Sequence, residues 1–135
     1  MQISLSKQGG ITVMHIAGDV DASNYTDVIN KAQEAYDDGA RRLLLDLSRV
    51  AYVSSAGLMA LHTVALIFTG QSVKSQDGGR PSFRALNPQQ DANVREYVKL
   101  LDPQPAVEQV LDVVGLKQFF EIHTDLDAAV KSFQG

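Results

Sequence analysis

The sequence predicts an α/β protein in which helices pack on a mainly parallel sheet that begins with an antiparallel hairpin. Segments with strand character alternate with segments of helical periodicity, an order typical of parallel sheets. The run Leu43-Leu44-Leu45-Asp46-Leu47 is almost continuously apolar and short, as expected of a central strand buried on both faces. A chain of 135 residues suits one core, so we expect a single domain over residues 1–135.

The first elements expected along the chain are a hairpin and an amphipathic helix. Gly9-Gly10 supplies a turn between an alternating segment and residues 11–17, which are rich in β-branched side chains. A helix is predicted from Ser23 to Asp38, with Gly39 as its C-terminal stop. Its apolar face consists of Tyr25, Val28, Ile29, Ala32 and Tyr36.

A second helix is predicted after the central strand, from Ser54 to Phe68. A connector over residues 48–53 precedes it, and the Ser54-Ser55 pair is suited to capping its first turn. The apolar positions follow at steps of three and four residues. They are Leu58, Leu61, Ala65 and Phe68.

The second half of the chain has a less regular pattern. Glycines and polar residues predict a loop over residues 69–81, and Ser82–Leu86 is expected to be a short strand. Residues 87–104 are expected to form a long, proline-containing connector, with a helical turn or two over residues 94–101.

Three further elements are predicted near the C-terminus. Apolar residues at helical spacing from Val107 to Val114, followed by Gly115, indicate a helix. A last strand is expected over Phe119–His123, and Thr124 is expected to open a closing helix.

Composition excludes several classes of function. The net charge of −4, without a basic cluster, offers no footprint for nucleic acid. The absence of cysteine excludes a disulfide framework and a thiolate metal site. The N-terminus lacks a signal pattern, and the longest apolar run, Val64–Phe68, is far too short for membrane insertion, so we expect a cytoplasmic protein.

The serines at the start of the second predicted helix are the main candidates for a functional site. Ser54 and Ser55 follow a buried strand and a short connector, which places them near the carboxyl edge of the sheet, where open α/β sheets hold ligands. Free N–H groups and the positive end of the helix dipole would accommodate a phosphate there. Local pattern leaves open whether these serines form a switch or only cap the helix.

The segment LLLDLSRVAYVSSAGLMAL, residues 43–61, resembles the signature of STAS domains, the family of bacterial anti-sigma factor antagonists. Two other segments are similar to that family in the same order. Gly18-Asp19-Val20-Asp21 resembles the stretch after its second strand, and residues 114–122 resemble its closing helix-turn-strand. The resemblance covers residues 1–86 and 105–133 and implies a STAS-like fold.

The resemblance also implies a function for Ser55. In the family, the matching serine is phosphorylated by a partner anti-sigma factor that acts as a kinase. Here Ser54 stands where phosphorylated antagonists have Asp, and Ala56 stands where they have Ser or Thr. The expected partner-binding or phosphate environment consists of Asp19, Asp21, Ser54, Ala56, Gly57 and Leu58.

The expected mechanism is a switch in protein binding rather than catalysis. Unmodified protein would dock on an anti-sigma factor, or serine protein kinase, and free the sigma factor. Phosphorylation of Ser55 would add negative charge near Asp19 and Asp21 and weaken docking, and a phosphatase would reverse it. No cofactor is implied.

Two other classes of function remain as alternatives. The chain could act as a non-phosphorylated STAS scaffold in a signalling or transport assembly. A small serine hydrolase is a weaker alternative, because Ser55 and Gly57 partly imitate a nucleophile elbow, but Val53 replaces its first glycine. Such an enzyme would use Asp112 and His123 as the other members of its triad.

Metal and nucleotide sites have little support. Asp19 and Asp21 resemble the start of a calcium loop, but Asn24 and Asn30 occupy the positions of its glycine and glutamate. The three histidines, His15, His62 and His123, lack the spacing of a helical metal pair. Nucleotide binding at the sheet edge has no phosphate-loop motif behind it.

Overall fold

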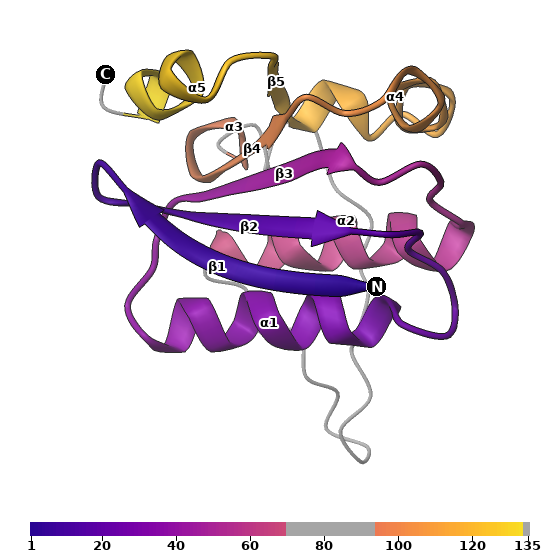
Figure 1. Ribbon diagram of the computed structural model, residues 1–135, viewed down its shortest axis with the longest axis horizontal. Coiled ribbons are helices and arrows are strands. Elements are labelled where there is room, and N and C mark those ends of the chain that lie inside the picture. Colours follow the sequence, from indigo (N-terminus) through magenta and orange to yellow (C-terminus); the bar gives the residue numbers. More distant parts are fainter. Residues whose placement is uncertain (70–93, 134–135) are drawn as a thin grey trace.

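The computed structural model describes residues 1–69 and 94–133, and its centre is a five-stranded sheet in the order β1-β2-β3-β4-β5 (Figure 1). β1 and β2 pair in antiparallel fashion, whereas β2 through β5 pair in parallel. The strands are β1 (Gln2–Gln8), β2 (Ile11–Ala17), β3 (Leu43–Arg49), β4 (Val98–Leu101) and β5 (Glu121–His123). This arrangement confirms the predicted mainly parallel sheet with an N-terminal hairpin.

Two helices lie side by side along one face of the sheet (Figure 1). They are α1 (Tyr25–Asp37) and α2 (Ser55–Phe68), close to the predicted bounds. The predicted apolar faces are the ones that pack in the core: most of their members are buried, while Tyr25, Tyr36 and Leu58 are partly buried against it. Burial of these stripes is the main favourable term that holds both helices on the sheet.

The opposite face of the sheet is covered in part by α5 (Leu126–Phe133). Ala129 and Phe133 of this helix form a buried cluster with Ile11, Val13, Leu44 and Leu101 of the sheet. The Lys99 Nζ donates a hydrogen bond of 2.9 Å to the Ser132 hydroxyl and lies 4.7 Å from the centre of the Phe133 ring. These contacts fix α5 over one end of the face and leave the other end open.

The prediction for residues 87–104 was wrong in one important respect. The expected helical turn is present as α3 (Val94–Tyr97), but residues 98–101 form the fully buried strand β4 rather than part of a connector. β4 has only four residues, and Lys99 interrupts its apolar character, so it carries little strand signal. The predicted strand Ser82–Leu86 lies outside the described residues.

The C-terminal elements follow the predicted order with shifted bounds. α4 (Pro105–Val113) corresponds to the predicted helix. The last strand begins at Glu121 rather than Phe119, because a 3₁₀ turn over Lys117–Phe119 turns the chain before it enters the sheet. α5 begins two residues after Thr124.

Candidate functional site

The loops that follow β2 and β3 are joined by backbone hydrogen bonds. Gly18 N–H donates to the carbonyl of Arg49 at 3.1 Å, and Val20 N–H donates to Tyr52 at 3.0 Å. Ser54 N–H then donates back to the carbonyl of Val20 at 2.9 Å. The segment from Gly18 to Asp21 is therefore fixed against the start of α2.

The two serines at this edge have different roles. The Ser54 hydroxyl accepts a hydrogen bond from Gly57 N–H at 3.3 Å, and Ser54 has the extended backbone typical of an N-cap. Ser55 is the first residue of α2, its side chain is exposed, and its hydroxyl has no hydrogen bond within residues 1–69 and 94–133. Capping therefore accounts for Ser54 and leaves the Ser55 hydroxyl available to a partner.

Gly57 is required by a close approach of two chain segments. A Cβ atom at this position would lie 2.6 Å from Val53 Cγ1 and 2.7 Å from the carbonyl oxygen of Val20. Real Cβ atoms essentially never approach so closely. The absence of a side chain at Gly57 thus lets α2 begin directly against the β2 loop.

The two aspartates of the β2 loop also differ. The Asp21 carboxylate accepts hydrogen bonds from the backbone N–H and the hydroxyl of Ser23, which lower the pKa of Asp21 below its ordinary value. Asn24 ties this turn together, since its side chain accepts from Asp21 N–H and donates to the carbonyl of Asp19. Asp21 therefore organises the turn into α1, whereas the carboxylate of Asp19 is exposed.

Two exposed apolar side chains that the sequence analysis did not single out lie on either side of Ser55 in the sequence. Tyr52, in the connector, is 56% exposed, and Met59, four residues after Ser55 on the same face of α2, is 40% exposed. Ala56 and Leu58 are partly buried, and Leu58 packs against the core. The helical spacing of Ser55 and Met59 was the available signal, but the connector position of Tyr52 gave none.

The residues proposed for a hydrolase triad do not come together. In the described part of the chain, the His123 ring pairs with Glu121 at 2.6 Å, and no hydrogen bond joins it to Asp112 or Ser55. Asp112 lies exposed on α4. Among the described residues, Ser55 therefore has no hydrogen-bonded general base.

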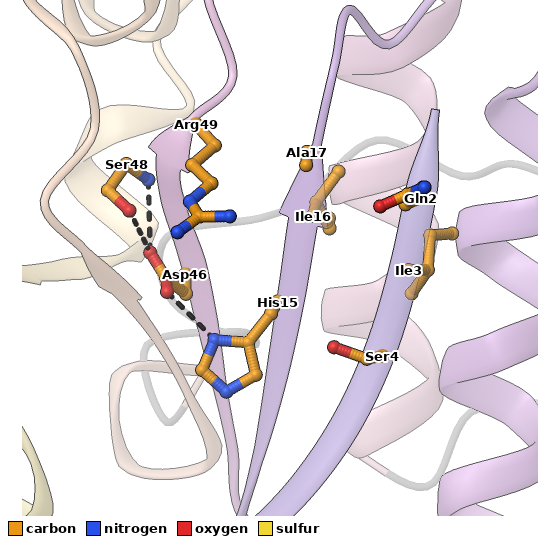
Figure 2. A pocket seen from close by; sticks show the side chains of 9 residues that line it. All are labelled: Gln2, Ile3, Ser4, His15, Ile16, Ala17, Asp46, Ser48 and Arg49. Atoms are coloured by element: carbon orange, nitrogen blue, oxygen red, sulfur yellow. Dashed lines mark hydrogen bonds and ion pairs between the residues drawn. The ribbon is translucent and has the colours of Figure 1, made fainter.

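A second polar cluster lies on the open part of the sheet (Figure 2). His15 Nδ1 donates to Asp46 Oδ2 at 2.9 Å, from neighbouring positions of β2 and β3. The Asp46 carboxylate also accepts from the backbone N–H of Ser48 at 3.0 Å and its hydroxyl at 2.7 Å. Burial raises the pKa of Asp46, but these hydrogen bonds outweigh it, so that the net pKa lies below the ordinary value.

Two other kinds of feature are absent from the described ranges, a metal-binding cluster and a membrane-spanning helix. Over residues 1–69 and 94–133, there is no group of three or more His, Asp or Glu side chains placed to hold a metal ion. In the same ranges, no helix has the length and apolar character needed to cross a membrane.

An N-terminal hairpin, a parallel sheet and a serine-led helix at its carboxyl edge together define a SpoIIAA-like α/β domain. The family model described as "Mlab, STAS domain" matches residues 3–124, and the chain therefore belongs to the STAS domain family. The resemblance to STAS domains predicted from the sequence is thus confirmed, and proteins named as anti-sigma factor antagonists are among the relatives of the chain.

Individual relatives agree with this assignment. The chain is 25% identical to "Putative anti-sigma factor antagonist BtrV" of Bordetella bronchiseptica, over 99% of this chain and 96% of that protein. It shares its fold with an anti-sigma factor antagonist from Mycobacterium paratuberculosis, with a TM-score of 0.71, 17% identity, and coverage of 99% and 94% of the two chains. Phosphorylated SpoIIAA of Bacillus gives a TM-score of 0.61 at 14% identity, with 97% and 99% covered.

Proposed function

We propose that the protein is a cytoplasmic, non-enzymatic anti-sigma factor antagonist controlled by phosphorylation of Ser55. It binds an anti-sigma factor of the serine kinase type and thereby releases a sigma factor. The observation that carries this proposal is the difference between the two serines at the start of α2. Ser54 caps the helix, whereas Ser55 is exposed and its hydroxyl has no hydrogen bond to any described residue.

The local electrostatics support a switch at Ser55. A phosphate carries about −1.5 to −2 charges at neutral pH. On the free protein, the positive end of α2 tolerates this charge. In an interface, the same charge would require desolvation and would lie beside the loop that carries Asp19 and Asp21. A loss of about 3 kcal/mol would weaken docking about a hundredfold.

The surface around Ser55 also has the character of a docking site. Tyr52 and Met59 are exposed on either side of Ser55 in sequence, and aromatic and Met side chains are enriched in protein interfaces. Their removal from water would favour binding only while Ser55 is uncharged. The names of the relatives support a partner of the anti-sigma factor class.

A non-phosphorylated scaffold is the second candidate. Ser54 in place of the family's Asp removes a carboxylate beside the acceptor, which favours this alternative. The two candidates differ in whether Ser55 is needed for regulation, and both require a bound partner.

The test is the intact mass and phosphosite map of the protein purified from its host, with Ser55→Ala and Thr26→Ala alongside. Thr26 is an exposed hydroxyl residue of α1 and serves as the matched control. We expect one phosphate on Ser55 that is absent only from Ser55→Ala, and partner binding that phosphorylation weakens. Absence of phosphate while a partner still copurifies would refute the phosphorylation switch and favour the scaffold.

A further inference from the structure

The end of the sheet face that α5 does not cover is hollowed. α5 covers the end of the face around Val13 and Leu44, and beyond it β1 and β2 present Ser4 and Ala17. The resulting hollow has a volume of about 770 Å³ and lies on the face opposite to α1 and α2. This volume is within the range of about 300–1,000 Å³ that small-molecule sites occupy.

The two charged groups that face the hollow, Asp46 and Arg49, differ in whether they have partners. The Asp46 carboxylate is already satisfied by three hydrogen bonds, two from Ser48 and one from His15. Arg49 also lines the hollow, and its exposed guanidinium has no ion pair or hydrogen bond with any residue that the structure describes. Figure 2 shows Arg49, Asp46 and His15 on the same side of the sheet. Arg49 is therefore the charged group of the lining whose side chain has no partner among the described residues, whereas the Asp46 carboxylate is engaged by Ser48 and His15.

The remaining polar groups of the lining can donate hydrogen bonds. Gln2 and Ser4 of β1 carry an amide and a hydroxyl at its edge, and both are exposed (Figure 2). A planar guanidinium with nearby neutral donors is the arrangement that recognises carboxylate and phosphate groups. An apolar ligand would offer no hydrogen-bond acceptor to these groups or to the guanidinium.

His15 is held in place on both sides. Its Nδ1 contacts Asp46, and its Nε2 lies 3.0 Å from the Ser6 hydroxyl. The chain Ser6–His15–Asp46 has the residue types of a hydrolase triad. Ser6, however, is not among the residues that line the hollow, and its hydroxyl is engaged by His15 Nε2. The cluster thus positions the imidazole as part of the wall.

We propose that this hollow binds a small anion bearing a carboxylate or phosphate group, with Arg49 as its charge partner and Ser4 and Gln2 as hydrogen-bond donors. The site uses none of the residues around Ser55 and does not rest on the proposed regulatory function. A bound anion would bridge β1 and β3 across the hairpin.

The test follows backbone amide shifts of the isotopically labelled full chain by NMR. Sodium phosphate and sodium succinate are titrated separately, and sodium chloride at equal ionic strength corrects for screening. Arg49→Gln removes the proposed charge partner, and Arg42→Gln is its control, because Arg42 is an exposed residue immediately before β3 with the same charge. Ser4→Leu fills the hollow without changing the net charge.

We expect saturating shifts at Ser4, His15 and Arg49 with at least one anion, at a Kd of about 1 mM or tighter. Arg49→Gln and Ser4→Leu should weaken binding at least about tenfold, and Arg42→Gln should not. The anion that saturates identifies the class of ligand. Shifts no larger than those of chloride, or equal losses in the two arginine variants, would overturn the proposal.

Discussion

Gly57, at the start of α2, packs directly on the carbonyl oxygen of Val20, and this oxygen accepts the backbone N–H of Ser54. The β2 loop and the first turn of α2 therefore meet with no room for a side chain. This contact sets the position of Ser55 relative to Asp19 and Asp21.

Gly57→Ala should destabilise the protein despite the better helix propensity of alanine. Propensity favours Ala by about 1 kcal/mol, but the new methyl group would collide with Val53 and the Val20 carbonyl. Overpacking of this kind costs about 1–3 kcal/mol and should outweigh the gain. Urea unfolding measures the difference, and an unfolding free energy equal to or above that of the wild type would contradict the close approach.

Alanine substitution should separate the roles of Ser54 and Ser55. Ser54→Ala removes the cap on Gly57 N–H and should lower the free energy of unfolding by about 1 kcal/mol. The Ser55 side chain is exposed and has no hydrogen bond to any described residue. Ser55→Ala should therefore change the free energy of unfolding by less than about 0.5 kcal/mol. Urea unfolding of both variants tests this, and a larger loss in Ser55→Ala would show that Ser55 has a structural role.

Protonation of Asp46 should reduce stability in acid. Hydrogen bonds from Ser48 and His15, acting against burial, hold its pKa below the ordinary value of 3.8 in the folded state. A lowered carboxyl pKa stabilises the folded state above pH 3.8, and this contribution is lost as the pH falls through the folded-state pKa.

Asp46→Asn isolates this contribution from those of other carboxylates. The variant should have a lower free energy of unfolding at neutral pH, because it loses a charged hydrogen-bond acceptor for His15. Its difference from the wild type should shrink as the pH falls below 3.8. Urea unfolding as a function of pH measures both effects, and a difference that does not change with pH would contradict them.

Periodicity predicted the elements of the fold that bury long apolar stripes. α1 and α2 each bury such a stripe, and β3 is almost continuously apolar, so their local patterns match their final environments. β4 is only four residues long and includes Lys99, whose ammonium is accommodated by Glu121, Ser132 and the Phe133 ring. Those partners are distant from Lys99 in the sequence, so the local pattern around β4 could not predict that this lysine would be buried.

The residues of the two polar sites also differ in whether the sequence alone could predict them. Ser54, Ser55 and Gly57 lie in one short motif that resembles the family signature, so they were found from the sequence. The pairing of His15 with Asp46 depends on the register of β2 and β3, which are separated by a whole helix. Sequence spacing treats these two residues as unrelated, and only the sheet brings their side chains together.

Tyr52 and Met59 should contribute more to partner binding than to stability. Both are exposed in the free protein, so Tyr52→Ala and Met59→Ser should each change the free energy of unfolding by less than about 0.5 kcal/mol. If these side chains are buried in the docked complex, each should contribute more than about 1 kcal/mol to the binding free energy. Each variant should therefore bind the partner severalfold more weakly. Val113→Ser is the matched control, because Val113 is apolar and 78% exposed but lies on α4.

Calorimetric titration with the partner copurified from the host measures the affinities. Equal losses in all three variants would point to a general apolar effect, and wild-type affinity in Tyr52→Ala and Met59→Ser would place the docking surface away from Ser55.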